Sequence, residues 1–463
     1  MKFVHKNIGL YISLVVLLFV SVSCEQFVDI DAPKGVQDKE TTFSNDGSAT
    51  AAVLGLYAYY ENKMVPLNNA TGLAADERMS TNAADAEFLN NSITIENAVN
   101  SSSFWNILYA QIRNCNLAIN AMDKSPTLSL PVKSQLTGEA RFMRAYMYFN
   151  LLNLYGGVPL SLSAVGTENA TLPRNTEEEV WGQIFTDLLA AKSLLKPEYP
   201  SADKARANKY AVSALLARAY LYHKEWAKAE AEATEVIESG VYSLSSPAAT
   251  FKKGSTETIL QLSTQTGRSS LVTNNVPANP AITPRYFLRP GFDLAFEKNS
   301  GGVDDARKSN WTGKNNAGIY YSYKYKVLTG SGDEYTILFR LAELYLIRAE
   351  ARAQQSKLIG PNNAESDLNV IRTRAGLDNK LNLNRAAMLA AIEQERKVEL
   401  FAEYMHRWFD LKRTAGSTDN TKTRADEVLS ALKGAFWQPT DKLFPIPSVE
   451  IVHNPALIQN LGY

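Results

Sequence analysis

The chain has 463 residues, and its 48 Lys and Arg residues balance its 48 Asp and Glu residues, so the formal net charge is zero. A chain of this length can bury a large core, and arrays of helical repeats grow as one unit to this size. No stretch rich in Lys or Arg alternates with aromatic residues. This excludes a partner with a phosphate backbone, so we expect no nucleic acid among the ligands.

The N-terminus has the pattern of a secretory signal. A short basic start precedes an apolar run over 8–22, which is too short for a comfortable membrane span. Ser23 and Cys24 follow this run, and a Cys that follows small residues at this place resembles the lipobox of bacterial lipoproteins. We therefore expect residues 1–23 to be removed and Cys24 to be acylated, so that a lipid anchor holds the protein at a membrane. Ordinary secretion with an incidental Cys is the alternative.

The polar stretch 24–45 is predicted to be a tether between this anchor and the folded part. Once the signal is removed, Cys115 is the only other Cys, so no internal disulfide is possible in the mature chain. Cys115 lies among apolar residues on a predicted helix, where a buried small residue is expected rather than a nucleophile.

One helix organises the rest of the chain. The stretch 139–160 reads EARFMRAYMYFNLLNLYGGVPL, and its apolar residues recur on two faces, which is typical of a helix buried on both sides. Gly156 and Gly157 are predicted to end this helix. Arg141 and Arg144 should be paired, because they lie deep in a helical array.

Helical periodicity predicts further helices on either side of this one. They cover 48–61, 104–123, 176–195, 340–353, 363–374 and 392–411. Thr176 followed by Glu179 is the signature of a capping box. The stretch 209–240 has the tetratricopeptide spacing, in which two antiparallel helices meet through small residues. Because such hairpins stack and share cores, we expect an all-α, tetratricopeptide-like array of about four units.

The predicted organisation has three folded parts. Helical hairpins occupy 46–240, an irregular region rich in loops follows over 241–335, and 336–463 holds a further hairpin, a long helix and an extended tail. The irregular region contains two runs that resemble strands, 258–262 and 318–328. We expect this region to bind the ligand.

No catalytic motif is present: the sequence lacks the nucleophile elbow, the P-loop, the zinc-protease helix and paired C-x-x-C. The histidines beyond the signal are isolated, so we expect no metal and no cofactor. Glu399 and Glu403 lie one helical turn apart, and two close carboxylates suggest glycoside hydrolysis. Together with Glu395 and Arg407, however, they form an i,i+4 stripe, which is more simply an ion-pair network between helices. We therefore expect a protein that is not an enzyme, with a glycosidase as the rival hypothesis.

Aromatic residues in the irregular region are candidates for stacking on sugar rings. Strand alternation places Tyr321, Tyr323 and Tyr325 on the core face and Tyr320 on the exposed face. Trp311 lies in a polar loop, where its indole either clamps the loop or offers a face to a ligand.

Polar groups on a neighbouring loop would bind the hydroxyls of such a sugar. The stretch 62–103 is predicted to be a long loop, and loops of this length in a compact domain are usually functional or disordered. It supplies Glu77, Arg78 and Asn82 as candidate ligand-binding residues, although the charged residues could equally mark a helix terminus. Tyr286, in the irregular region, is a weaker stacking candidate.

Several stretches of the chain resemble the signatures of the SusD/RagB family. Besides 139–160, they are FRLAELYLIRAEA (339–351), ERKVELFAEYMHRWFDLKR (395–413) and PIPSVEIVHNPALIQN (445–460). The resemblance implies a fold of four tetratricopeptide units that docks on a SusC-like, TonB-dependent barrel transporter in the outer membrane. It also implies a lipid-anchored, non-catalytic lid facing the cell exterior.

The cargo of such a lid is an oligosaccharide, or a peptide in the RagB-like branch. The oligosaccharide is our main hypothesis and the peptide is the alternative. A tetratricopeptide scaffold that holds only partner proteins remains a third possibility.

Overall fold

The computed structural model describes residues 42–463. The predicted signal peptide, Cys24 and nearly all of the predicted tether lie outside the described residues. The described chain forms one unit, Phe43–Tyr463. None of its helices is long and apolar enough to cross a membrane.

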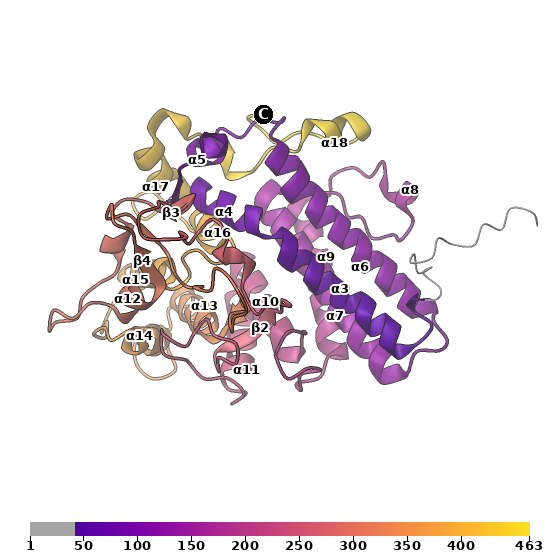
Figure 1. The fold of residues 1–463 in the computed structure, drawn as a ribbon, viewed down its shortest axis with the longest axis horizontal. Helices are drawn as coiled ribbons and strands as arrows, with labels where there is room; N and C mark the ends of the chain where they lie inside the picture. Colours follow the sequence, from indigo (N-terminus) through magenta and orange to yellow (C-terminus); the bar gives the residue numbers. More distant parts are fainter. Residues whose placement is uncertain (1–41) are drawn as a thin grey trace, which may run out of the picture. The chain divides into compact units, whose positions relative to one another are not determined.

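The all-α fold class is confirmed, because helices make up most of this unit and the strands are few and short (Figure 1). In its first half the helices are α3 (Asp46–Lys63), α4 (Val65–Ala74), α5 (Ala86–Asn90), α6 (Asn106–Lys124), α7 (Leu130–Tyr155), α8 (Gly166–Asn169), α9 (Glu177–Leu194), α10 (Lys209–Tyr222) and α11 (Trp226–Ile237). In its second half they are α12 (Ala306–Trp311), α13 (Leu341–Gln354), α14 (Ala364–Arg374), α15 (Arg385–Glu399), α16 (His406–Arg413), α17 (Arg424–Lys433) and α18 (Ser448–His453).

The strands form three antiparallel pairs, each of two strands. The pairs are β1 (Arg78–Ser80) with β3 (Tyr286–Leu288), β2 (Thr258–Leu262) with β6 (Thr336–Arg340), and β4 (Thr312–Lys314) with β5 (Tyr320–Ser322). The first two pairs join segments far apart in the sequence and so connect the irregular region to the helices, whereas only residues 315–319 separate β4 from β5.

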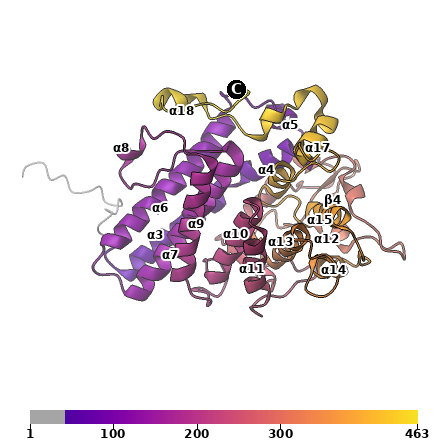
Figure 2. The same ribbon diagram turned by 180° about the vertical axis from the view of Figure 1, so that it is seen from behind.

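The predicted organising helix is α7. It packs against α3, α6 and α9, and these helices run side by side in Figures 1 and 2. Gly156 ends it with φ of 74°, a conformation that favours glycine. Gly157 is needed for a different reason, because a Cβ atom there would lie 2.2 Å from the backbone oxygen of Asn175.

The two arginines of α7 are paired, as predicted. Arg144 donates from Nε and Nη2 to the two carboxylate oxygens of Asp187 on α9, at 2.8 and 2.7 Å. Arg141 donates to the same carboxylate at 2.9 Å. Because the Asp187 side chain is fully buried, this cluster joins α7 to α9 in a place where an unpaired charge would be costly.

The predicted helix pairs are in contact: α3 with α6, α7 with α9, α10 with α11, and α13 with α14. The capping box at the start of α9 is present, with Thr176 and Glu179 bonding each other's backbone N–H groups. Cys115 is buried on α6, as predicted, and burial raises the pKa of its thiol to about 12.

Three predictions of local structure are wrong. The stretch 62–103 is not a long loop, because it holds α4, β1 and α5, and its polar residues Asn68, Asn69 and Thr71 are buried. The run 318–328 forms a strand only over Tyr320–Ser322.

The third wrong prediction is the single helix over 392–411. It is interrupted between α15 and α16 by a segment in which Ala402, Tyr404 and Met405 have positive φ. Contacts made by this segment, described below, hold it in that conformation.

Candidate functional site

The β1–β3 pair brings predicted site residues from distant parts of the sequence together. Arg78 lies opposite Leu288, and Ser80 lies opposite Tyr286. β5, which begins at Tyr320, contacts β3. The sequence therefore identified segments that do meet in the fold.

Glu77 and Arg78, however, are buried and bonded to the protein itself. Their exposed fractions are 5% and 3%. Glu77 accepts a hydrogen bond from the backbone N–H of Ala402 at 3.0 Å, and Arg78 donates to the Ala402 carbonyl at 3.3 Å and to Asn275 Oδ1 at 2.9 Å. These two residues fix the segment between α15 and α16, so the expectation that they reach a ligand is wrong.

Trp311 is also a core residue, with 1% of its surface exposed. Its indole N–H donates to the Pro247 carbonyl at 2.7 Å, and its ring packs edge to face against Phe251. The ammonium group of Lys324 lies 4.6 Å from the ring centroid. No face of the indole remains for a sugar, so the structure supports the clamping alternative.

The other aromatic candidates are divided between the core and the surface. Tyr286, Tyr321 and Tyr325 are buried, whereas Tyr323 is half-buried because the strand has ended before it is reached. Tyr320 is half-buried, with the Lys314 ammonium 4.9 Å from its ring centroid.

Asn82 is exposed, and its side-chain oxygen accepts from the backbone N–H of Ala84, which caps the short 3-10 helix Ala83–Asp85. Of the predicted ligand-binding residues, Tyr320 and Asn82 keep surface that a ligand could contact.

Glu399 and Glu403 belong to a buried ion-pair network, as the sequence analysis favoured. Glu399 binds Arg307 (Nη1 to Oε2, 2.8 Å) and also pairs with Arg340 and Arg374. Arg340 reaches Glu403 as well, at 2.9 Å. The partners come from α12 in the irregular region (Arg307), from β6 (Arg340) and from α14 (Arg374), so the network joins these parts to the end of α15 and does not follow a helical stripe.

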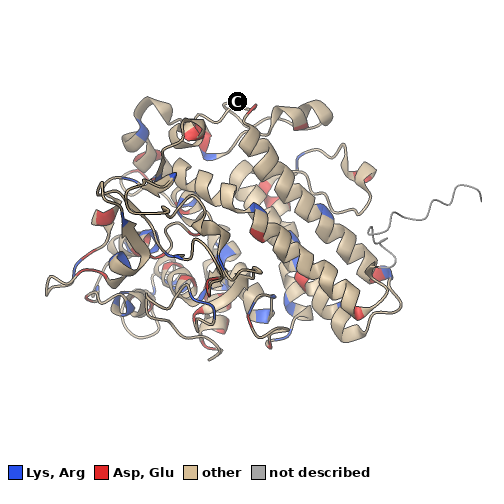
Figure 3. Cartoon of the chain, in the orientation of Figure 1, with Lys and Arg blue, Asp and Glu red and all other residues tan. Residues whose placement is uncertain are grey.

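The network holds Glu399 in its ionised form. Burial acts to raise its pKa, but Arg374, Arg340 and Arg307 together hold the pKa of this carboxyl well below its ordinary value. A general acid must carry a proton, so this carboxylate is unsuited to that role. Figure 3 shows positive and negative residues mixed through the part of the molecule that holds α12, α14 and α15.

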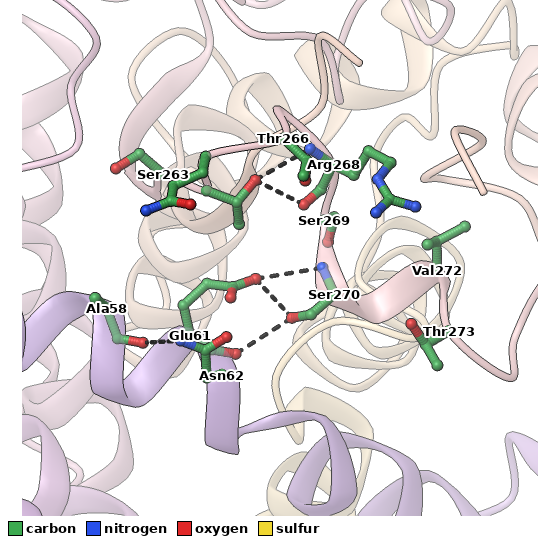
Figure 4. A pocket seen from close by; sticks show the side chains of 12 residues that line it. Ala58, Glu61, Asn62, Ser263, Thr266, Arg268, Ser269, Ser270, Val272 and Thr273 are labelled. Carbon is green, nitrogen blue, oxygen red and sulfur yellow. Dashed lines mark hydrogen bonds between the residues drawn. The ribbon is translucent and has the colours of Figure 1, made fainter. Parts of the chain in front are cut away.

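A polar cavity of about 510 Å³ lies between the end of α3 and the segment that follows β2 (Figure 4). It is lined by hydroxyl and amide side chains, one carboxylate, one guanidinium and few apolar groups. The lining residues are Ala58, Glu61, Asn62, Ser263, Thr264, Gln265, Thr266, Arg268, Ser269, Ser270, Val272 and Thr273. No aromatic ring is among them.

Glu61 is fixed at the wall of this cavity and is 3% exposed. Its Oε1 accepts from the hydroxyl of Ser270 at 2.6 Å, from the backbone N–H of Ser270 at 3.3 Å and from the hydroxyl of Thr336 at 3.4 Å. No described residue donates to Oε2, which leaves one carboxylate oxygen available.

The residues of this cavity are not among the predicted site residues for two reasons. The sequence pattern marks Glu61 only as the end of a predicted helix, and in the irregular region, where ligand binding is expected, the candidates are aromatic residues and not the hydroxyl and amide residues of Ser263–Thr266. The one available signal was the run of hydroxyl and amide residues directly after the strand 258–262. In residues 42–463, no group of three or more His, Cys, Asp or Glu residues is placed to hold a metal ion.

Two family models match the chain. Residues 251–463 match the model of the SusD family, and residues 27–221 match a model described as starch-binding and associating with the outer membrane. The chain belongs to the SusD family, as its signature stretches indicated.

Similar proteins cover nearly the whole chain. A SusD-like protein of Formosa agariphila is 24% identical over 99% of both chains, and one of Bacteroides ovatus is 27% identical over 89% of this chain and 83% of its own length. A SusD superfamily structure from Parabacteroides distasonis has a TM-score of 0.76 at 24% identity, covering 90% of this chain and 99% of its own. A laminarin-binding SusD-like protein has a TM-score of 0.72 at 23% identity, with the same coverage. These structures show the shared fold.

Proposed function

We propose that this protein is a non-catalytic lipoprotein of the outer membrane, anchored by Cys24, that binds an oligosaccharide and delivers it to a SusC-like, TonB-dependent barrel transporter. In this proposal the protein faces the cell exterior and acts as a lid over the barrel. The observation that carries the binding function is the polar cavity between α3 and the segment after β2.

The chemistry of the cavity suits a polyhydroxylated ligand. Gln265, Thr266 and Thr273 are exposed on its wall and offer donors and acceptors, while the free oxygen of Glu61 is an acceptor only. Ligand sites place a few polar groups to fix orientation, and a volume of about 510 Å³ lies in their usual range. The laminarin-binding neighbour and the starch-binding family model support a glycan as cargo.

The absence of catalysis is part of the proposal and rests on electrostatics. The one carboxylate pair that suggested hydrolysis is buried, and Glu399 is paired with three arginines. A glycosidase needs its carboxyl groups on either side of the substrate bond, with one of them protonated.

Calorimetry with panels of oligosaccharides and peptides tests the binding function on the full mature chain in detergent. We expect an oligosaccharide to bind. The double variant Gln265→Ala/Thr266→Ala should weaken its binding about tenfold, because a tenfold change in affinity corresponds to the free energy of a little over one hydrogen bond. Thr167→Ala, which removes an exposed hydroxyl from α8, is the control. Binding of peptides alone, or equal affinity in all variants, would contradict the proposal.

The anchor and the partner are tested separately. Cys24→Ala should move the protein from the membrane fraction to the soluble fraction. A tagged wild-type chain should co-purify with a TonB-dependent barrel from membranes, and recovery of a soluble partner alone would instead support the scaffold alternative.

A further inference from the structure

Two charged groups on the wall of the polar cavity lack ion-pair partners. Several other buried carboxylates of this unit bind an Arg directly: Glu139 binds Arg206, Asp187 binds Arg144, and Glu343 binds Arg218, at 2.5 to 2.7 Å. Within the described residues, Glu61 and Arg268 form no ion pair, either with each other or with another residue. Both line the cavity in Figure 4, Glu61 from α3 and Arg268 from the facing segment.

Arg268 has unused hydrogen-bond donors. Its Nη1 donates to the carbonyl oxygen of Leu328, which is a neutral acceptor. Its Nε–H is buried and has no hydrogen-bond partner, and no described residue accepts from Nη2. Nε and Nη2 form the edge of a guanidinium that binds a carboxylate through two parallel hydrogen bonds. A buried donor without an acceptor is costly, so a ligand carboxylate at this edge would be favoured.

Glu61 offers the opposite chemistry. Its Oε1 is already occupied by Ser270 and Thr336, while Oε2 is free to accept hydrogen bonds from ligand hydroxyls. A hexuronic acid carries the complement of both groups on one pyranose ring, namely a carboxylate on C5 and hydroxyls on C2 and C3. The lack of an aromatic side chain in the lining means that recognition depends on these polar groups and not on stacking.

We propose that this cavity selects acidic saccharides, with Arg268 binding the carboxylate of a uronic acid residue and Glu61 binding hydroxyls of the same sugar. The inference rests on the proposed function, since it specifies the class of oligosaccharide that the cavity takes. An acidic peptide would offer carboxylates to Arg268 but lacks the paired ring hydroxyls that suit Glu61.

The test measures the affinity of the full mature chain for trisaccharides of galacturonic, glucuronic and mannuronic acid, each compared with its carboxyl-reduced, neutral counterpart. We expect at least one uronate to bind about tenfold or more tightly than its neutral counterpart. The preference should weaken at high salt, because a charge pair near solvent is screened.

Variants assign the preference to Arg268. Arg268→Gln should abolish the preference for the uronate, and Arg268→Lys should restore part of it by restoring the charge without the planar fork. Arg113→Gln removes one exposed positive charge from α6 and should leave the preference unchanged. Thermal unfolding checks that each variant is folded. Tighter binding of the neutral trisaccharide by a folded Arg268→Gln variant would support the assignment of the uronate preference to Arg268.

The outcomes separate the two proposals. Equal binding of acidic and neutral trisaccharides, or a preference that survives in Arg268→Gln, overturns the selection of acidic saccharides and leaves the oligosaccharide function intact. If no saccharide of either kind binds while a peptide does, the proposed function and this inference both fail.

Discussion

The substitution Glu399→Gln tests whether the buried charge network holds the irregular region to the helices. The side chain of Glu399 is fully buried and lies between three guanidinium groups, those of Arg307, Arg340 and Arg374. Glutamine keeps the shape of the side chain but removes its negative charge. Removing one partner of a buried pair typically lowers the free energy of unfolding by about 3–5 kcal/mol, because the remaining charges stay buried.

The assay is unfolding in urea at neutral and at acidic pH. Although burial acts to raise the pKa of Glu399, the three arginines hold it well below its ordinary value in the folded state. Its stabilising contribution is therefore present above the ordinary glutamate pKa of about 4.3 and is lost as the pH falls through the folded-state pKa. The difference between wild type and Glu399→Gln should accordingly be largest near neutral pH and should shrink in acid.

Glu198→Gln is the matched control, because Glu198 is exposed and makes no ion pair with another described residue. It should change the free energy of unfolding by less than about 0.5 kcal/mol. If Glu399→Gln behaves like this control at neutral pH, the network does not stabilise the fold as argued. If wild type releases sugar from a glycan and Glu399→Gln does not, the glycosidase hypothesis replaces the binding protein.

Substitutions at four further positions test single features by urea unfolding. Burial lowers the pKa of Lys412 to about 7. The free energy of unfolding should therefore rise by up to about 4 kcal/mol between about pH 7 and about pH 10, and Lys412→Met should lack this rise. If wild type and variant show the same slope of unfolding free energy against pH, the burial of a charged amine at this position is refuted. Ala402→Gly should be neutral or stabilising by up to about 1 kcal/mol, whereas Ala402→Val should be clearly destabilising, because φ at this position is 59°. Gly157→Ala should cost about 2–3 kcal/mol, since the new Cβ would lie 2.2 Å from the oxygen of Asn175; no loss would mean that the chain moves aside easily. Thr176→Ala should cost about 1 kcal/mol through loss of the capping box, and a result below about 0.3 kcal/mol would show that the box is not formed.

The helices with clear apolar faces could be predicted from the sequence. The α7 helix and the pair α10–α11 have repeating apolar and small residues, and the end of α7 carries a local signal, Gly156. Periodicity of this kind depends only on residues a few positions apart, so no knowledge of the tertiary fold is required. The pairing of Arg144 was also predictable, because a buried charge on a two-sided apolar helix must find a partner.

The candidate site could not be predicted to the same extent, because burial of polar residues is decided by tertiary contacts. Glu77 and Arg78 have the composition of a surface loop, yet they are buried and hold the backbone of Ala402. The same contacts explain the missed break between α15 and α16. A helical pattern continues through this stretch, but partners distant in sequence stabilise positive φ there. Trp311 was undecided for the same reason, since its clamp is a carbonyl 64 residues away.

The buried network and the polar cavity use charge in opposite ways, and this difference argues that binding occurs at the cavity. Around Glu399 the carboxylates and guanidinium groups are paired with one another, and the energy of those pairs fixes one arrangement of the chain. At the cavity, Glu61 and Arg268 each keep capacity that the protein itself does not use. A charge that is already ion-paired within the protein gains less from a charged ligand than a charge that has no ion-pair partner. The residues that give the family its signatures are therefore expected to maintain the scaffold, and cargo choice is expected to depend on cavity residues that lie outside those signatures.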